Sequence, residues 1–262
     1  MKIAVITDLE GTAGVVDFET QTYPGARYFE EAKLLATEEV NAACEGAFQA
    51  GADEVLVVDG HGAGGLIPEK IHPKALILHG RPVSRFWLME KGWDALFLLG
   101  HHAMNGTENG NLNHTYSSRS IVNMWLNGEK IGEIGIGIYL AGWFGVPTIL
   151  VTGDEAACQE ARKYIPGIET AVVKWGLNRT CAISRSHQAA CQVIEQAASR
   201  AVKNIARYKP LKLKGKVELV TEFISSADAF IWQQRREAEK VNATTVRFTG
   251  KDFLDAYEKW RG

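Results

Sequence analysis

Short apolar runs alternate with longer amphipathic segments along most of this chain, and this alternation limits the possible folds more than any other feature. Apolar runs of strand length occupy residues 2–7, 54–59, 75–78, 95–99 and 148–152. Between the first two, residues 26–51 place apolar side chains at helical spacing and end at Gly51, which predicts a long helix. Strands that alternate with helices are typical of a mostly parallel sheet with helices on its faces. We therefore expect an α/β fold with a mostly parallel sheet flanked by helices.

The second half of the chain continues this pattern and then changes. Asp154 in an N-cap position predicts a helix over residues 154–165, and residues 170–175 read as a strand. A second long helix is expected over 186–207, followed by the basic connector "YKPLKLKGK". The remaining segments predict two strands and a closing helix at 217–223, 244–248 and 251–260. We expect a larger α/β domain over residues 1–207 and a smaller α+β carboxyl-terminal subdomain over 208–262, packed on it.

Charge and composition exclude several partner classes. The chain has 262 residues, with 29 basic and 31 acidic side chains and a formal charge of -2, so no positive field attracts nucleic acid or an anionic membrane. Residues 134–153 carry no charge and are long enough to span a bilayer. Gly142, Gly145 and Pro147 interrupt them, which favours a helix, a turn and a strand in a soluble protein.

The amino terminus and the cysteines predict the compartment. The first residues enter a strand pattern directly and show no signal-peptide pattern. The four cysteines lie far apart without Cys-x-x-Cys spacing, which favours reduced thiols. We expect a cytoplasmic protein.

Carboxylates and imidazoles follow three of the apolar runs at the point where each run ends. The residues concerned are Asp8 and Glu10 after 2–7, His61 after 54–59, and His101 and His102 after 95–99. If these strands are parallel, all three ends meet at the carboxyl edge of the sheet, where open α/β folds keep their sites. Carboxylates and imidazoles suit zinc or a pair of divalent ions. The sequence therefore predicts a metal site in one crevice, in which Asp8 or Glu10 is shared by two ions.

Three further residues of this region keep alternative interpretations. Glu133 begins the glycine-rich helix, where it serves either as a ligand or as an acid that favours the helix dipole. Successive side chains alternate along an extended backbone, so only one of His101 and His102 is expected to be a ligand. His114 follows a polar loop and is either an exposed loop residue or a group that transfers protons or stabilises an oxyanion.

Two alternatives to a metal-dependent hydrolase are a phosphatase and a non-enzymatic protein with a structural metal site. The segment "TDLEGT" is similar to the opening of haloacid-dehalogenase-type phosphatases, with Asp8 as the nucleophile. Glu10 replaces their second aspartate, however, and the histidines would have no role. A structural metal site in a non-enzymatic oligomer would be closed by four protein ligands. Five candidate ligands and a histidine on a loop suit an open two-metal site better.

Several blocks of this sequence, in their order along the chain, resemble the zinc D-aminopeptidases first associated with a bacterial dipeptide-transport operon. These blocks are "TDLEGTAG", "VLVVDGH", "LFLLGHHA", "NHTYS", "GEKIGEIGIGIYLAGWFGVPTILVTGDE" and "TTVRFTGKDFLDAY". Each block is weak alone, but the ordered set is specific and covers nearly the whole chain. One departure is the loop "MNGTENGNLN" at 104–113, which leaves the substrate preference open.

The resemblance implies an activity, a ligand set and an assembly. The activity is metal-assisted hydrolysis of an amide bond, most simply by an aminopeptidase acting on short peptides or amides with an N-terminal D-amino acid. An amidase for another small amide is the alternative. The assembly is a homodecamer of two stacked pentameric rings, for which the glycine-rich helix would serve in subunit packing. The implied ligands of two zinc ions per subunit are Asp8, Glu10, His61, His102 and Glu133.

The resemblance also assigns roles where the residues alone left them open. It selects His102 over His101 as the ligand and makes Glu133 a ligand. It makes His114 the catalytic residue, as an acid or base, as an oxyanion stabiliser or, less naturally, as a nucleophile.

Overall fold

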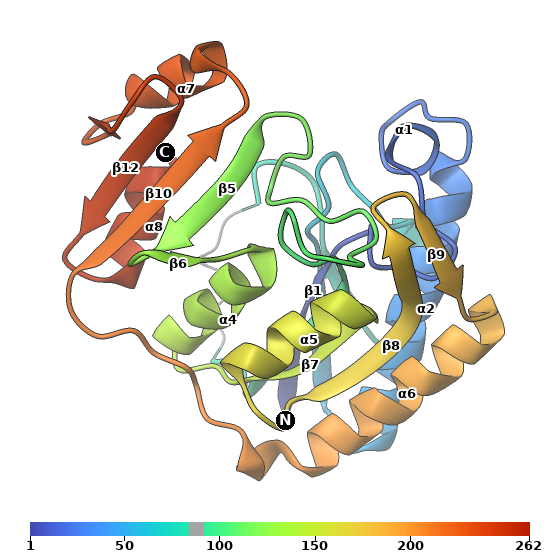
Figure 1. Ribbon diagram of the computed structural model, residues 1–262. Coiled ribbons are helices and arrows are strands. Elements are labelled where there is room, and N and C mark those ends of the chain that lie inside the picture. Colours follow the sequence, from blue (N-terminus) through green and yellow to red (C-terminus); the bar gives the residue numbers. More distant parts are fainter. Residues whose placement is uncertain (84–91) are drawn as a thin grey trace.

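The computed structural model describes residues 1–83 and 92–262, whose strands form two sheets (Figure 1). The larger sheet has the order β3-β2-β1-β4-β7-β8-β9. Its strands from β3 to β8 pair in parallel, and β9 adds an antiparallel edge. The bounds are β1 Lys2–Thr7, β2 Glu54–Asp59, β3 Leu76–Leu78, β4 Ala95–His101, β7 Thr148–Asp154, β8 Glu169–Asn178 and β9 Cys181–Ser184. The α/β class and the mostly parallel sheet are confirmed.

Helices cover both faces of this sheet and bury its apolar side chains. The helices α2 (Phe29–Gln49) and α6 (His187–Lys203) pack together on one face, against Ile3 and Val5 of β1. The helices α4 (Glu133–Trp143) and α5 (Glu155–Tyr164) lie on the other (Figure 1). Strands buried on both faces read as continuous apolar runs, which explains why the sequence identified them.

The second sheet is antiparallel, has the order β11-β12-β10-β5-β6, and packs on the α4 side of the larger sheet. Its strands are β5 Ile121–Leu126, β6 Glu129–Lys130, β10 Val217–Phe223, β11 Glu239–Lys240 and β12 Thr245–Gly250. Two helices, α7 (Ser226–Gln233) and α8 (Phe253–Arg261), accompany it. The short elements α1 (Phe18–Gln21), η1 (Pro68–Lys70) and η2 (Ile205–Arg207) complete the described chain.

The second sheet takes strands from both parts of the chain. β5 and β6 come from the middle of the sequence, where no strand was expected, and β5 pairs with β10 of the carboxyl-terminal part. The segment "IVNMWL" of β5 is apolar except for Asn123 and shows no strict alternation, so it was not recognised as a strand. The division into domains at residues 207 and 208 stays a prediction.

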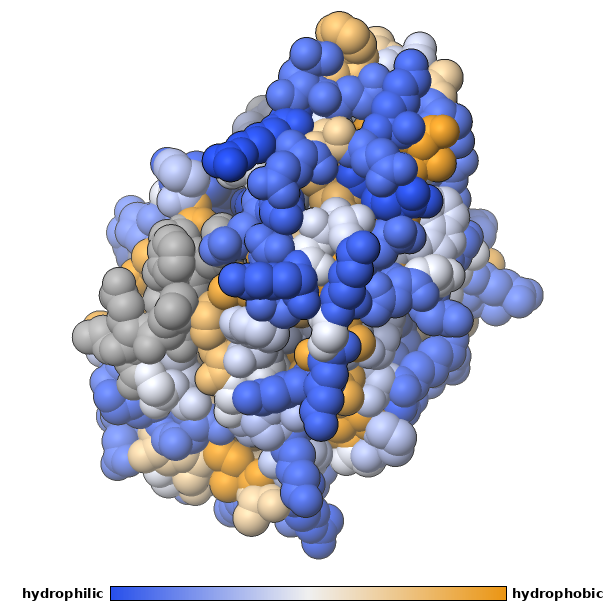
Figure 2. Space-filling model, turned by 90° about the vertical axis from the view of Figure 1, so that its left-hand side faces the viewer, coloured by the Kyte–Doolittle hydropathy of each residue, from blue (hydrophilic) through white to orange (hydrophobic). Residues whose placement is uncertain are grey.

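The helix α4, which carries no charge after Glu133, packs against other parts of the same chain. A Cβ atom on Gly135 would lie 2.6 Å from the Tyr164 hydroxyl, and one on Gly142 would lie 1.8 Å from the carbonyl oxygen of Leu211. These two glycines therefore allow close packing within the chain. The packing between subunits that the family resemblance implied for this helix stays a prediction. Within the described residues no helix has the length and apolarity needed to cross a membrane. On the face shown in Figure 2, hydrophilic side chains predominate and apolar ones lie in separate spots.

Candidate metal centre

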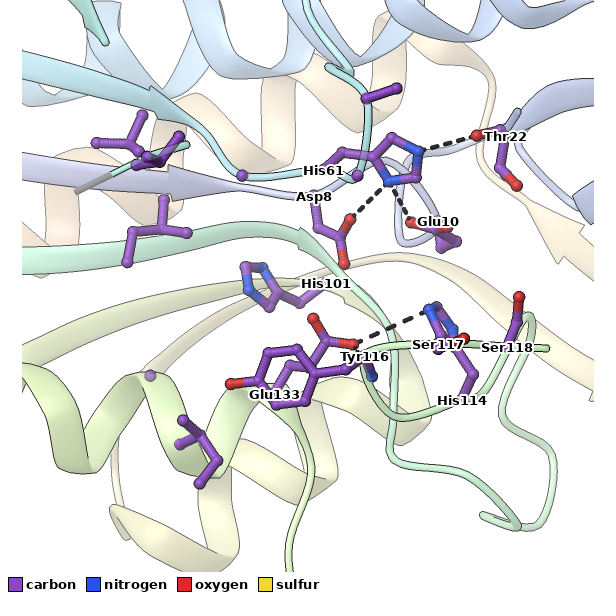
Figure 3. A pocket seen from close by; sticks show the side chains of 18 of the residues that line it. Asp8, Glu10, Thr22, His61, His101, His114, Tyr116, Ser117, Ser118 and Glu133 are labelled. Carbon is purple, nitrogen blue, oxygen red and sulfur yellow. Dashed lines mark hydrogen bonds and ion pairs between the residues drawn. The ribbon is translucent and has the colours of Figure 1, made fainter. Parts of the chain in front are cut away.

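A cavity of about 600 Å³ opens at the carboxyl edge of the larger sheet. The ends of β1, β2 and β4 supply Asp8, His61 and His101 to it, and α4 supplies Glu133. Figure 3 shows Asp8, Glu10 and His61 on one side of the cavity and Glu133 and His114 on the other. The expectation that parallel strand ends bring these residues to one edge is confirmed.

The first cluster consists of Asp8, Glu10 and His61, whose potential ligand atoms lie within 4.8 Å of one another. His61 Nε2 donates a hydrogen bond to the carbonyl oxygen of Thr22 at 2.9 Å. Its Nδ1 atom then faces Asp8 Oδ1 and Glu10 Oε2, each at 3.0 Å. A carbonyl that fixes the tautomer of a histidine in this way is typical of metal sites.

The second cluster consists of His102, His114 and Glu133, again within 4.8 Å. His102 Nδ1 donates to the carbonyl oxygen of Ala103 at 3.0 Å, which leaves Nε2 facing Glu133 Oε1 at 3.2 Å. The imidazole rings of His102 and His114 stack with their centroids 3.8 Å apart.

Asp8 connects the two clusters through its two carboxylate oxygens. Oδ1 lies 3.0 Å from His61 Nδ1, and Oδ2 lies 3.2 Å from His102 Nε2. One carboxylate between two groups of ligand atoms is the arrangement that two neighbouring cations require, because the shared negative charge offsets their repulsion.

Unsatisfied atoms indicate that these residues fit a cation. Glu10 Oε2 and His102 Nε2 are buried and make no hydrogen bond, although oppositely polar atoms lie 3.0 to 3.2 Å away. Buried polar atoms are normally hydrogen-bonded, so such exceptions need a cause. Imidazole nitrogens and carboxylate oxygens are the ligands that zinc accepts.

The electrostatics of the clusters agree with this interpretation. Burial alone would lower the pKa of His102, but the carboxylates of Asp8 and Glu133 outweigh burial and hold this pKa well above its usual value. Glu10 and Asp8 do the same for the pKa of His61. Although burial alone would raise the pKa of Asp8, His102 and His61 hold it well below its usual value. Asp8 is therefore charged and lies between two imidazoles that hold positive charge, which a bound cation would replace.

His114 has a different environment from the other histidines of the clusters. Its Nδ1 donates to the carbonyl oxygen of Leu112 at 2.9 Å, so Nε2 carries a lone pair and lies 3.9 Å from Glu133 Oε1. Burial and the neighbouring His102 lower its pKa. A neutral imidazole with a free Nε2 in a cavity can accept a proton.

Close backbone approaches hold the strand ends in place. The Asp8 N–H donates to the Leu99 carbonyl at 2.8 Å, and the Gly11 N–H donates to the Gly100 carbonyl at 2.7 Å. A Cβ atom on Gly11 would lie 2.2 Å from the carbonyl oxygen of His101. Only glycine therefore lets the loop after β1 approach the end of β4 so closely.

Both histidines at the end of β4 reach the site. β4 ends at His101, so His102 lies past the strand and the expected alternation does not apply. The His101 ring lines the cavity, its Nδ1 donates to the Leu99 carbonyl at 3.2 Å, and burial lowers its pKa. The structure thus brings all six predicted site residues together, and their individual roles stay predictions.

Sequence reasoning missed a set of buried polar side chains behind the site. Lys174 of β8 is fully buried and donates to the carbonyl oxygens of Glu10 and Val15. Burial lowers its pKa to about 8, and burial raises the pKa of nearby Glu39 to about 8. A lysine inside the apolar strand "TAVVKW" is the signal that could have identified this network.

A second buried acid supports the other cluster. Glu160 Oε2 of α5 accepts the Met104 N–H at 2.8 Å, two residues after His102. Its other oxygen, Oε1, lies close to Gly132, the residue before Glu133: a Cβ atom on Gly132 would be 3.0 Å from it. Burial raises its pKa to about 7. In the sequence Glu160 is an ordinary helix residue, so no local signal marks it.

Comparisons with known proteins agree along the whole chain. The family model for D-aminopeptidase matches residues 1–261. A D-aminopeptidase of Bacillus subtilis (strain 168) is 32% identical over 262 residues, which cover 98% of this chain and 94% of the relative. The solved structure of the Zn-dependent D-aminopeptidase DppA from Bacillus subtilis, a self-compartmentalizing protease, is similar with a TM-score of 0.91 at 32% identity, covering 99% of this chain and 95% of that one.

Proposed function

The chain belongs to the D-aminopeptidase family, and we propose that its cavity holds two zinc ions that share the Asp8 carboxylate. It is a zinc-dependent aminopeptidase for short peptides or amides with an N-terminal D-amino acid. The observation that carries the two-ion proposal is the position of Asp8, whose two oxygens face the histidines of both clusters at 3.0 and 3.2 Å. Under this proposal Asp8, Glu10 and His61 hold one ion, and Asp8, His102 and Glu133 hold the other.

The neighbouring carbonyl groups prepare the ligands before any ion binds. Thr22 and Ala103 each accept one ring N–H, from His61 and His102, so the other ring nitrogen of each histidine faces the carboxylates and becomes a ligand once its proton leaves. Because burial keeps water away from these groups, their orientation costs little reorganisation when the ion binds. When bound, zinc polarises a carbonyl group and supplies a nucleophile at neutral pH.

His114 moves the proton in the proposed reaction. Its Nδ1–H is held by the Leu112 carbonyl, so Nε2 is the atom that accepts a proton from the attacking nucleophile. The same atom then donates this proton to the nitrogen of the departing residue, which leaves as a neutral amine. The lowered pKa of His114 keeps its ring in the receptive neutral form. This geometry favours the acid and base role over covalent attack.

Two measurements test the metal site and the activity. We expect elemental analysis of the purified protein to find two zinc ions per chain. We expect D-alanyl peptides to be cleaved in preference to matched L-alanyl peptides. One zinc per chain would contradict the shared site, and equal cleavage of both series would contradict the D-selectivity. Strong hydrolysis of p-nitrophenyl phosphate with magnesium alone would favour the phosphatase alternative, which the comparisons do not favour.

We also propose that the chain forms a homodecamer of two stacked pentameric rings in the cytoplasm. The similar Bacillus subtilis structure is that of a self-compartmentalizing protease. The β8–β9 hairpin offers an apolar surface for such contacts, because Trp175, Leu177 and Ile183 are 37%, 56% and 58% exposed. Trp175 and Ile183 pair directly across the two strands. Contiguous exposed apolar side chains mark interaction surfaces.

Native mass spectrometry tests this assembly. The expected species contains ten chains of 28.8 kDa. Ile183→Asp should release smaller species, whereas Lys203→Asp on α6 serves as a surface control. A monomer at micromolar concentration would contradict the proposal.

A further inference from the structure

Three arginines line the cavity, and two of them already form hydrogen bonds with other groups of the chain. Arg81 donates to three backbone carbonyl groups at 2.6 to 2.9 Å, so its guanidinium is held by the loops beside it. Arg119 makes two hydrogen bonds with the Glu19 carboxylate at 2.9 and 3.0 Å. Arg261, the last residue of α8, lines the same cavity. Within residues 1–83 and 92–262 it forms no ion pair with a carboxylate.

The charge of Arg261 lies beside another cation. Arg235 is held over the Trp232 ring, with its guanidinium carbon 3.5 Å from the ring centroid, and it donates to the carbonyl oxygen of Trp260. Burial lowers the pKa of Arg235, and the Arg261 guanidinium lowers it further. Arg261 at the cavity wall, with a second guanidinium group behind it, leaves positive charge that an anion can neutralise.

Two tyrosines, Tyr116 and Tyr257, line the cavity together with Arg261, and these three residues form the wall considered below. Tyr116 has a left-handed backbone with φ of 57°, and its N–H donates to Glu133 Oε1 at 2.7 Å. The rings of Tyr116 and Tyr257 both pack against Trp260, the residue before Arg261, with centroids 4.7 and 5.8 Å away. Tyr257 precedes Arg261 by four residues on the same side of α8. The phenol hydroxyl of Tyr116 can donate a hydrogen bond.

We propose that Arg261, with the hydroxyls of Tyr116 and Tyr257, forms a subsite for a substrate carboxylate. The inference rests on the proposed function. Tyr116 links the two places, because its backbone N–H donates to Glu133 in the metal centre and the residue lines the same cavity as Arg261. In a dipeptide, the terminal carboxylate carbon lies only about 4 Å beyond the scissile carbonyl carbon. The terminal carboxylate of the departing residue is therefore the anion that reaches this wall when the scissile bond lies at the metal centre.

The chemistry of the wall suits this ligand. A guanidinium binds a carboxylate through two parallel N–H donors, and phenol hydroxyls add neutral donors. The same wall would also accept an acidic side chain of the departing residue. Both sources present the same carboxylate group, and matched substrates separate them.

The test compares substrates that differ only in their carboxylates. The zinc-loaded protein is assayed with D-alanyl-D-alanine and D-alanyl-D-alanine amide, and then with the amides of D-alanyl-D-glutamate and D-alanyl-D-glutamine. We expect the free acid to have the lower KM. In Arg261→Gln the KM for the free acid should rise about 10- to 100-fold, because a charge-assisted hydrogen bond is lost, while kcat changes little. The KM of Arg261→Lys for the free acid should lie between the values of the wild type and Arg261→Gln, since lysine keeps the charge and loses the planar guanidinium.

Arg236→Gln is the matched control, because this arginine is 94% exposed in the same part of the chain and does not line the cavity. A preference for D-glutamate over D-glutamine that Arg261→Gln abolishes would support the subsite with a side-chain carboxylate as its ligand. Equal KM values for acid and amide, unchanged in Arg261→Gln, would overturn the subsite while leaving the aminopeptidase intact. No cleavage of any of the four substrates would overturn the proposed function itself.

Discussion

The Asp8–Glu10–His61 cluster and the His102–His114–Glu133 cluster offer the same kinds of ligand atom, but the chain delivers them differently. In the first cluster, all residues follow the adjacent parallel strands β1 and β2 within three residues of their ends. In the second, His102 follows β4, Glu133 begins α4, and His114 comes from a loop. The first cluster is thus positioned by strand pairing, and the second by packing between elements distant in sequence.

The buried groups behind the two clusters differ in the same way. Lys174 is charged and holds the backbone of the Glu10 loop directly. Glu160 holds the backbone beyond His102 through the Met104 N–H, and burial raises its pKa to about 7. We infer that the first cluster depends on a buried charge network. The second depends on an acid that is partly neutral near physiological pH.

Replacement of Asp8 tests whether the two clusters work as one site and should have the largest effect. Asp8→Asn removes the charge that both proposed ions share, so we expect both zinc ions to be lost. Activity should fall on the order of 10³-fold or more, since bound metal contributes several kcal/mol to the transition state. Elemental analysis and hydrolysis of D-alanyl-D-alanine measure this, with Asp53→Asn at the exposed amino-terminal ion pair as the control. One fully retained zinc would show that the clusters bind independently.

Replacement of His114 tests whether the second cluster holds a catalytic residue beside its ligands. His114→Ala should keep two zinc ions per chain and lose about 10²- to 10⁴-fold in kcat, because it removes the proton acceptor and donor. Parallel zinc analysis and steady-state kinetics separate the two effects. Loss of one zinc would make His114 a ligand, and full activity would remove it from the mechanism.

The same contrast explains how much of the molecule the sequence predicted. The parallel strands of the larger sheet and the long helices follow from local period and capping, so they were identified within a few residues, whereas the antiparallel edge strand β9 was missed. The first cluster follows from them, because parallel strands align their carboxyl ends. For Glu133 and His114 the residues alone left two interpretations, since contacts between α4, a loop and β4 decide their placement. Only the family resemblance favoured one.

Other features had no local signal. β5 pairs with β10, whose partner residues lie 93 to 102 positions away in the chain, and its sequence shows no strict alternation that would predict a strand. The cavity brings together Tyr116, Tyr257 and Arg261 because the helix α8 packs on the second sheet and places Trp260 against Tyr116. Glu160 and Lys174 become important through burial, which spacing alone does not reveal.

Replacement of Lys174 tests the support of the first cluster. Lys174→Met leaves the carbonyl oxygens of Glu10 and Val15 without their buried donor and Asp154 without its nearby cation, so we expect a loss of about 3 to 5 kcal/mol in the free energy of unfolding. The Glu10 loop should also lose its anchor, which weakens zinc binding in the first cluster before the second. Urea unfolding and zinc titration measure both effects, with Lys163→Met on the exposed face of α5 as the control. An unchanged midpoint of urea unfolding would show that the buried hydrogen bonds of Lys174 do not stabilise this region.

Replacement of Glu160 tests the support of the second cluster and should have the smallest effect. The folded pKa of about 7 lies above the reference value of 4.5. The stabilisation from its bound proton is therefore complete below the unfolded pKa and is lost as the pH rises through 7, by up to about 3 kcal/mol. Glu160→Gln keeps an acceptor for the Met104 N–H and cannot ionise, so its free energy of unfolding should fall less between pH 5 and 8. Urea unfolding at several pH values gives the difference between variant and wild type, which cancels the titration of groups that both proteins share. Parallel curves would mean that Glu160 ionises normally and that the second cluster is supported by packing alone.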